Sequence, residues 1–190
     1  MKWSPREATF SDKNSIQELL VRSAIELQKD TYSKEQIHAA LGPVFGVDEQ
    51  MIQDNTYFVV EHDNAIVGCG GWSFREALFG GRSANDNESR CLDPRTDAAR
   101  VRAFFVDPLF SRQGIGSCIM KTFEDAIIAQ GFKKGEISAT LVGEPLYRKF
   151  GYTTTEHYEI ALAGALPLRV ARMIKTYKNG EQDDGGKRDK

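Results

Sequence analysis

Apolar residues in the first part of the chain repeat at the spacing of amphipathic helices. In SIQELLVRSAIELQ they recur every three or four positions, and Ser11 or Asp12 stands where a helix cap is expected. The stretch SKEQIHAAL follows the same pattern, with Ser33 and Gln36 at the spacing of a capping box and Gly42 after its end. We therefore predict two helices near the beginning of the fold, preceded by a short strand.

The middle of the chain changes to the pattern of β-strands. TYFVVEHDNAIVGCGGWSF contains two β-rich runs around Asp63 and Asn64, which predicts a hairpin, and ARVRAFFVD reads as a buried strand. GSCIMKTFEDAIIAQG returns to helical spacing, and a strand in GEISATLV, a short helix in EPLYRKFG and a final pair of strands follow. Because strands and helices alternate without a repeat or a linker, we predict one domain of the α/β (α+β) class over residues 1–177.

Two segments follow neither pattern. Residues 75–98, REALFGGRSANDNESRCLDPRTDA, form a longer connection than most in compact domains, so we expect them to be either functional or mobile. Residues 178–190 are polar and rich in glycine, which is the composition of a disordered tail.

Composition narrows the classes of partner. The 190 residues include 25 Lys and Arg and 27 Asp and Glu, a net charge of -2, so no basic field favours nucleic acid or an anionic membrane. The first residues lack the apolar core of a signal peptide, and no apolar run is long enough to span a membrane. The three cysteines neither pair closely nor neighbour a histidine, so no metal site is indicated. We expect a cytoplasmic protein whose partners are small molecules.

The turn VDPLFSRQGIGS joins the predicted strand ARVRAFFVD to the helix after it. A helix that begins near Gly116 leaves its first backbone N–H groups unpaired, and such groups attract anions. Gly114 and Gly116 permit close approach of a phosphate, and Arg112 adds a positive charge. The glycines could instead only shape a tight turn. A Walker A loop is excluded because no Gly-Lys-Ser/Thr follows, and the third glycine of a dinucleotide-binding fingerprint is missing.

RAFFVDPLFSRQGIGSCIM resembles the coenzyme A-binding motif of the GNAT N-acetyltransferase family. Three further stretches are similar to other parts of that family: REATFSDKNSIQELL to its first strand and helix, YFVVEHDNAIVGCGGW to its next hairpin and LYRKFGY to a late tyrosine signature. The resemblance implies a mixed, twisted sheet flanked by helices. This sheet would splay open between the strands at 101–106 and 136–141, and acetyl-coenzyme A (acetyl-CoA) would lie in the cleft.

The resemblance also implies roles for individual residues of the cofactor motif. Phe105 and Val106 would offer backbone groups to the pantetheine arm, and Arg112 would contribute its charge beside the pyrophosphate. The backbone N–H groups that would hold the pyrophosphate are those of Gln113, Gly114, Ile115, Gly116 and Ser117. Two positions depart from the family pattern: Ser111 stands where the family has Arg or Gln, and Thr140, a further cofactor contact, stands where many members have Asn.

Acetyl transfer to an amine needs a neutral amine, a donor to the oxyanion and a proton for the departing thiolate. The resemblance places Tyr147 as the general acid that protonates the sulfur, although this residue could instead be a packing aromatic. The resemblance also implies that a backbone N–H of the splayed strand, that of Val106 or its neighbour, donates to the oxyanion. ARVRAFFVD lacks the central glutamate that some relatives carry, so the candidate base is Glu61, another acid or a water chain.

We expect the segment before the cofactor strand to form the wall of the acceptor site. Its candidate residues are aromatic or acidic: Trp72, Phe74, Phe79, Glu88 and Asp93. The predicted function is transfer of an acetyl group from acetyl-CoA to a primary amine of a small molecule, or of a peptide, by direct attack in a ternary complex. The missing strand glutamate and the two altered cofactor positions leave an alternative, an acyl-CoA-binding module that senses or regulates without turnover. The last strand pair could expose an edge through which a homodimer would form.

Overall fold

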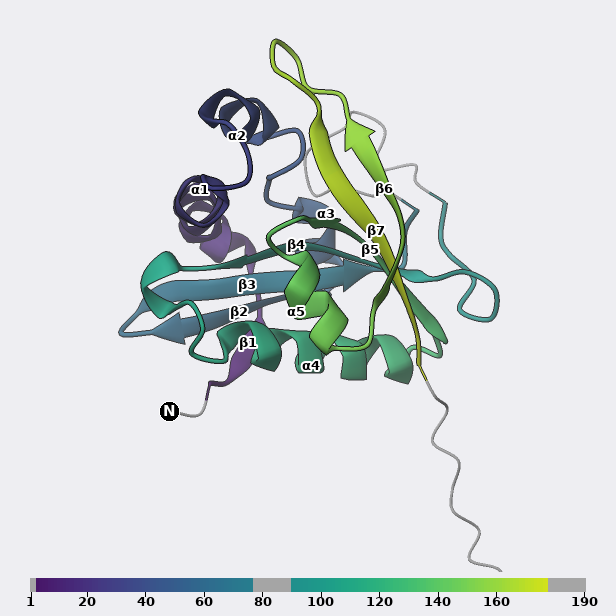
Figure 1. Cartoon of the computed structure of the whole chain (residues 1–190). Coiled ribbons are helices and arrows are strands. Elements are labelled where there is room, and N and C mark those ends of the chain that lie inside the picture. Colours follow the sequence, from purple (N-terminus) through teal and green to yellow (C-terminus); the bar gives the residue numbers. More distant parts are fainter. Residues whose placement is uncertain (1–2, 77–89, 178–190) are drawn as a thin grey trace, which may run out of the picture.

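The structure is a computed structural model that describes residues 3–76 and 90–177. In these residues seven strands form one mixed sheet in the order β1-β2-β3-β4-β5-β7-β6 (Figure 1). The strands are β1 (Pro5–Glu7), β2 (Tyr57–His62), β3 (Ala65–Ser73), β4 (Ala99–Val106), β5 (Lys134–Thr140), β6 (Thr153–Ile160) and β7 (Leu168–Thr176). The α-helices are α1 (Lys13–Gln28), α2 (Lys34–Ala40), α3 (Glu49–Gln53), α4 (Ile115–Ala129) and α5 (Glu144–Lys149). Short 3₁₀-helices span η1 (Phe10–Asp12) and η3 (Pro108–Phe110). The predicted α+β class with a single mixed sheet is confirmed.

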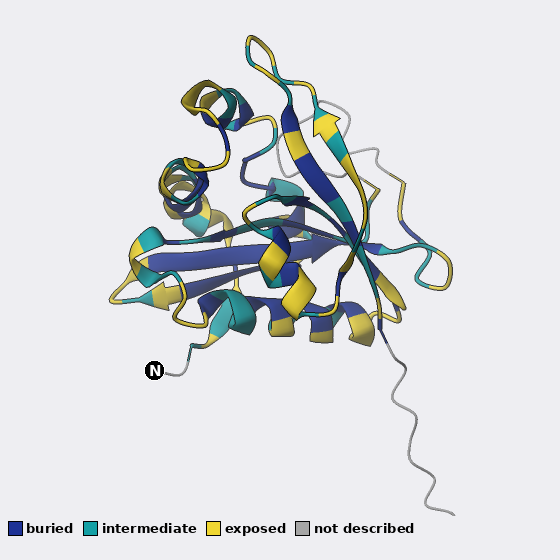
Figure 2. Ribbon diagram, viewed as in Figure 1, coloured by how far each residue is buried: buried dark blue, intermediate teal, exposed yellow. Residues whose placement is uncertain are grey.

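Helices cover both faces of the central strands. α1 lies against β3 and β4 on one face, and α4 lies against β2 and β3 on the other (Figure 1). β3 is consequently buried from Ile66 to Ser73, as Figure 2 shows, which explains why its sequence does not alternate between apolar and polar residues. Gly68 allows α4 to approach closely, because a Cβ at this position would lie 2.4 Å from Cγ2 of Ile115.

Local sequence signals set several turns and caps as predicted. Asp63 and Asn64 both adopt positive φ angles, 48° and 60°, as the two-residue hairpin turn between β2 and β3 requires. At the start of α2 the N–H of Gln36 donates to the Ser33 hydroxyl at 3.2 Å, and the N–H of Ser33 donates to the Gln36 side chain at 2.9 Å. The predicted capping box is therefore confirmed.

The sheet splays open between β4 and β5. These strands are parallel, and they pair only where Ala99–Val101 lies beside Gly135–Ile137, although β4 continues to Val106 and β5 to Thr140. A bulge interrupts β4 at Ala103, whose φ of 55° lies in the left-handed region. The Tyr57 hydroxyl donates to the Ala103 carbonyl at 3.0 Å and holds the bulge from inside the core. The splay predicted between 101–106 and 136–141 is therefore present.

Other predictions about the chain as a whole stay untested. β6 is an edge strand, so the last strand pair offers the predicted edge, but the homodimer stays a prediction. The tail at 178–190 and residues 77–89 of the long connection lie outside the described residues, and the domain boundary at 177 stays a prediction as well. Within the two described ranges, no helix has both the length and the apolar character that crossing a bilayer requires.

Candidate active site

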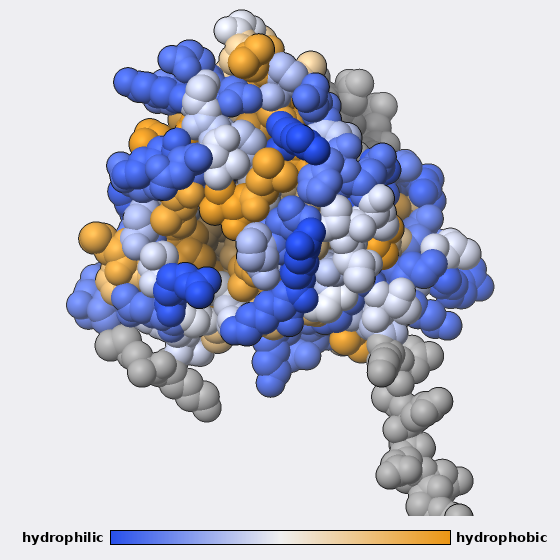
Figure 3. All heavy atoms as spheres, viewed as in Figure 1, coloured by the Kyte–Doolittle hydropathy of each residue, from blue (hydrophilic) through white to orange (hydrophobic). Residues whose placement is uncertain are grey.

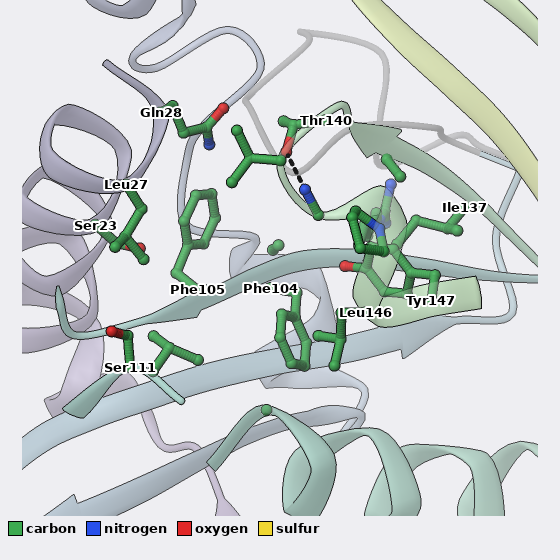
Figure 4. Close-up of a pocket in the computed structure, with 18 of the residues that line it drawn as sticks. Ser23, Leu27, Gln28, Phe104, Phe105, Ser111, Ile137, Thr140, Leu146 and Tyr147 are labelled. Carbon is green, nitrogen blue, oxygen red and sulfur yellow. Dashed lines mark hydrogen bonds between the residues drawn. The ribbon is translucent and has the colours of Figure 1, made fainter. Parts of the chain in front are cut away.

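A cavity of about 450 Å³ lies where β4 and β5 separate. α1 contributes one wall and α5 the opposite wall, with β4 and β5 between them (Figure 4). Figure 3 shows apolar surface around a hollow in this part of the molecule. The splay therefore opens into a cavity that is lined by residues of α1, β4, β5 and α5.

The loop before α4 and the first turn of this helix present backbone N–H groups at one part of this cavity. The first intrahelical bond of α4 runs from the Cys118 N–H to the Gly114 carbonyl, so the N–H groups of Ile115, Gly116 and Ser117 have no partner within the helix. Gly114 has a φ of 90°, and a Cβ built on it would meet no atom within 4 Å. The backbone can therefore approach a phosphate closely, and the side chain of Arg112 also lines the cavity. Backbone N–H groups in this arrangement could hold a phosphate group.

The backbone of β4 offers hydrogen-bonding groups to the cavity at Val106. The Asp107 N–H donates to the Val67 carbonyl at 2.9 Å, and the same register places Val106 opposite Gly68 and Phe105 opposite Cys69. Because hydrogen-bonded and non-bonded pairs alternate in an antiparallel ladder, the backbone groups of Phe105 face β3. Those of Val106 face away from β3, toward the gap beside β5, whereas the bulge at Ala103 interrupts this alternation before Phe104. The prediction that Phe105 offers backbone groups to the pantetheine arm is therefore not met, because its backbone pairs with β3. Phe105 nevertheless lines the cavity.

Tyr147 lies on α5 where its phenol borders the cavity (Figure 4). The ring is 4 % exposed and packs edge-on against Phe104, with ring centroids 6.1 Å apart. Burial raises the pKa of the phenol above its ordinary value of 10.0, so the group keeps its proton at neutral pH. Thr140 also lines the cavity, and its hydroxyl accepts a hydrogen bond from the Gly143 N–H at 3.2 Å. A protonated phenol therefore stands beside the backbone donors of β4.

A family model described as "Acetyltransferase (GNAT) domain" matches residues 53–154, more than half of the chain. The chain belongs to the GNAT acetyltransferase family. It is accordingly an acyltransferase, and the matched residues run from the end of α3 to the start of β6, so they include β4, the loop before α4 and α5.

Solved structures of GNAT proteins share the fold over nearly the whole chain. A GCN5-related N-acetyltransferase from Rhodopseudomonas palustris is 17% identical, with a TM-score of 0.71 over 93% of this chain and 97% of its own. The paia N-acetyltransferase from Thermoplasma acidophilum, solved with coenzyme A, is 14% identical, with a TM-score of 0.66 over 93% and 100%. The protein yncA from Salmonella typhimurium, solved with acetyl-CoA, is 13% identical, with a TM-score of 0.61 over 97% and 99%. No curated protein matches the sequence.

Several site residues predicted for this GNAT protein lie away from the cavity. Glu61 is on β2, where it forms an ion pair with Arg6, so it is not placed to act as the base. Trp72 is buried in the core beside Phe74 and Phe132, because helices cover both faces of β3. Phe74 packs at the edge of the same core, and Asp93 forms an ion pair with Arg95 at 3.0 Å. Phe79 and Glu88 lie outside the described residues.

Sequence reasoning missed the part of the GNAT cavity that α1 forms. The side chains that line it from α1 and the following segment are those of Ser23, Leu27, Gln28, Val44 and Phe45, and from the last strands those of Ile160 and Val170. The apolar spacing of α1 predicts a face that packs on the core, but it does not predict that the end of this helix lines a cavity. The available signal was the glutamine that ends this stripe four residues after Ala24, on the buried face.

Gln113 lies in the loop before α4, but it does not line the cavity. Its hydrogen bonds instead fix the shape of that loop. The Trp3 Nε1–H donates to the Gln113 carbonyl at 2.8 Å, and the Gln113 side chain donates to the Leu109 carbonyl at 3.2 Å. Trp3 also contacts the rings of Phe110 and His62 edge-on. The peptide that precedes Gly114 is thereby fixed from outside the loop.

Replacement of Trp3 by phenylalanine is expected to weaken the binding of acetyl-CoA about threefold to tenfold, which corresponds to the loss of one hydrogen bond that orients the loop. Phenylalanine keeps a ring beside His62 and Phe110 and removes only the indole N–H. Isothermal titration of the wild type and the variant measures the effect. An unchanged dissociation constant would show that the loop holds its shape without Trp3.

Proposed function

We propose that the protein is an N-acetyltransferase that moves an acetyl group from acetyl-CoA to the primary amine of a small molecule within a ternary complex. The observation that carries this proposal is the arrangement of one cavity: backbone N–H groups at a helix N-terminus, the outward-facing Val106 peptide and a buried protonated phenol all border it. Coenzyme A and acetyl-CoA in the structures of paia and yncA support the same choice of co-substrate.

The residues of β4 and α4 would bind and orient the co-substrate. The N–H groups of Ile115, Gly116 and Ser117 would hold the pyrophosphate, with Arg112 as an additional positive charge. The backbone groups of Val106 would bond the pantetheine arm in the manner of an added strand. The N–H of Val106 or of a neighbouring β4 residue would stabilise the negative charge that develops on the thioester oxygen.

Tyr147 would complete the transfer. The amine nitrogen forms a bond to the acetyl carbon as the carbon–sulfur bond breaks, and the Tyr147 hydroxyl gives its proton to the departing sulfur. The amine loses a proton in the same reaction, which restores the phenol or passes to water. Among the described residues no carboxylate and no imidazole lines the cavity, so the amine must arrive neutral or release its proton to water.

A binding assay followed by a turnover assay tests this function. A saturating concentration of acetyl-CoA, about 100 times its dissociation constant, is expected to stabilise the fold by about 2.7 kcal/mol in a thermal-shift assay. Adenosine diphosphate controls for nonspecific phosphate binding. Thiol release on addition of primary amines then reports turnover. A thermal shift without thiol release from any amine would favour the sensing module. The absence of a thermal shift with acetyl-CoA would argue against both functions.

A further inference from the structure

The cavity between β4 and β5 has walls on opposite faces of the sheet. On one face the Phe104 ring packs edge-on against Tyr147 of α5, with ring centroids 6.1 Å apart. On the other face the Phe105 ring packs edge-on against Phe45, in the segment after α2, at 5.9 Å. Leu27 of α1 lies on the side of Phe105 (Figure 4). A co-substrate whose phosphates bind at the start of α4 enters from the first face, so the second face is left for the acceptor.

The lining of this second face is mostly apolar. Its apolar side chains come from α1, the segment after α2 and the last two strands: Leu27, Val44, Phe45, Ile160 and Val170. We call these five residues the α1 wall. Leu27, Val44 and Ile160 are only half-buried, whereas the polar neighbours Ser23 and Gln28 are buried. The surface that the α1 wall offers to a ligand in the empty cavity is therefore apolar, and covering it favours binding.

The charges around the cavity are of one sign. Among the described residues, the charged side chains that line it are those of Arg102, Arg112 and Lys149. Arg102 forms a buried ion pair with Asp48 at 2.8 Å, and Asp48 itself does not line the cavity. A second positive charge on an acceptor would therefore lose its water against the α1 wall and meet no lining carboxylate.

Hydrogen bonds hold the α1 wall in place against the end of the sheet. Tyr32, just after α1, donates its hydroxyl proton to the Arg169 carbonyl at 2.7 Å and accepts from the Leu141 N–H at 2.9 Å. The Gln36 side chain donates to the Pro167 carbonyl at 2.7 Å. The segment that joins α1 to α2 is thus attached to both β5 and β7. A ligand does not have to order this wall, so less of the free energy of apolar contact is lost on binding.

We infer that the acceptor, in the function proposed above on which this inference rests, is a primary amine on an uncharged apolar chain, and that the α1 wall binds this chain. Selection comes from covering the half-buried side chains of Leu27, Val44 and Ile160 with methylene groups. Polyamines are poor acceptors, because their further ammonium groups would lie against the same apolar wall.

Unbranched primary amines from propylamine to hexylamine test the inference, since they have similar basicity and differ in apolar length. The kcat/KM from thiol release is expected to rise about fourfold for each methylene that reaches the wall, which corresponds to about 0.8 kcal/mol. The gain should appear in KM, because a contact far from the reacting atoms stabilises substrate and transition state alike. 1,5-Diaminopentane, which is pentylamine with a second amine, is expected to have a kcat/KM about tenfold below that of pentylamine.

Two substitutions in the α1 wall test its role directly. Leu27→Ala is expected to lower the hexylamine-to-propylamine ratio of kcat/KM about tenfold. Val44→Glu places a carboxylate at the wall and should reverse the preference between pentylamine and 1,5-diaminopentane. Ile25→Ala is the matched control: it removes the same number of carbon atoms from a half-buried side chain of α1 that does not line the cavity, so both ratios should stay at their wild-type values.

The outcomes distinguish this inference from the proposed function. If amines release thiol but their length has no effect, or if Leu27→Ala keeps the wild-type ratio, the α1 wall does not bind the acceptor and the inference is overturned. Faster transfer from hexanoyl-CoA than from acetyl-CoA, without an effect of amine length, would assign the wall to the acyl chain and overturn it as well. If no amine releases thiol, the proposed function fails and the inference with it, and the affinity of acetyl-CoA then shows whether the cavity is a binding site alone.

Discussion

Replacing Tyr147 with phenylalanine is expected to lower kcat by about 100-fold, the scale of a lost general acid, while the dissociation constant of acetyl-CoA stays nearly unchanged. The departing thiolate would then have to take its proton from water. The Tyr147 ring packs against Phe104, and phenylalanine preserves that contact. Steady-state thiol release gives kcat, and calorimetry gives the dissociation constant.

Tyr152 provides the matched control for this substitution. It is a buried tyrosine whose ring packs against Tyr147, but its hydroxyl bonds that of Tyr177 at 2.9 Å. Tyr152→Phe should therefore reduce stability and leave kcat within about twofold. Equal turnover of the Tyr147 variant and the wild type would assign Tyr147 to packing alone.

The pH dependence of the wild type provides a second readout for Tyr147. A general acid must be protonated to act, and a pKa raised above 10.0 keeps the phenol protonated across the neutral and mildly alkaline range. The rate should rise with pH until the acceptor amine is neutral and should not fall again below about pH 10. A decline near pH 8 would contradict the role given to this buried phenol.

Replacement of Gly114 by alanine is expected to weaken acetyl-CoA binding by about 100-fold, or about 2.8 kcal/mol. Gly114 has a φ of 90°, where a residue with a Cβ is strained by about 1–2 kcal/mol. The open space around the ideal Cβ position is also the space through which a phosphate approaches the N–H groups of α4. Isothermal titration with acetyl-CoA measures the loss.

Gly164→Ala separates backbone strain from the loss of binding. Gly164, between β6 and β7, has a φ of 72°, and a Cβ there would also meet no atom within 4 Å, but it does not line the cavity. Both variants should lose a similar amount of stability in thermal unfolding, and only Gly114→Ala should lose affinity. If both bind acetyl-CoA as well as the wild type does, the loop does not hold the pyrophosphate.

The loop before α4 could be predicted from the sequence because its chemistry is local. The unpaired groups at Ile115, Gly116 and Ser117 are backbone N–H groups, and a strand end, two glycines and a helical pattern are enough to place them. The family signature indicates Tyr147, which lines the cavity, and its role as the general acid stays a prediction. The strands and helices of the sheet were predictable because their periods repeat over many residues, whereas the place where the sheet splays was implied only by the family resemblance.

The acceptor wall could not be predicted because it depends on which faces of distant elements meet. Trp72 had the residue type of a ligand-binding wall, but α4 covers its side of β3 and makes it a core residue. Glu61 was chosen as an acid at a strand end, and β2 carries it to the surface beside Arg6 instead. The sequence signal of Gln28 is weak, since a single polar residue at the end of a helix has many ordinary explanations.

The bulge in β4 links the interior of the N-terminal half of the protein to its chemistry. The Tyr57 hydroxyl that holds the Ala103 carbonyl comes from a fully buried side chain of β2, and the Val106 peptide that faces the gap follows Ala103 on the same strand. A mutation in that interior can therefore alter turnover without touching any ligand. Repacking around Tyr57 to raise heat resistance would also act on the β4 bulge, so under the proposed function stability and turnover would change together there.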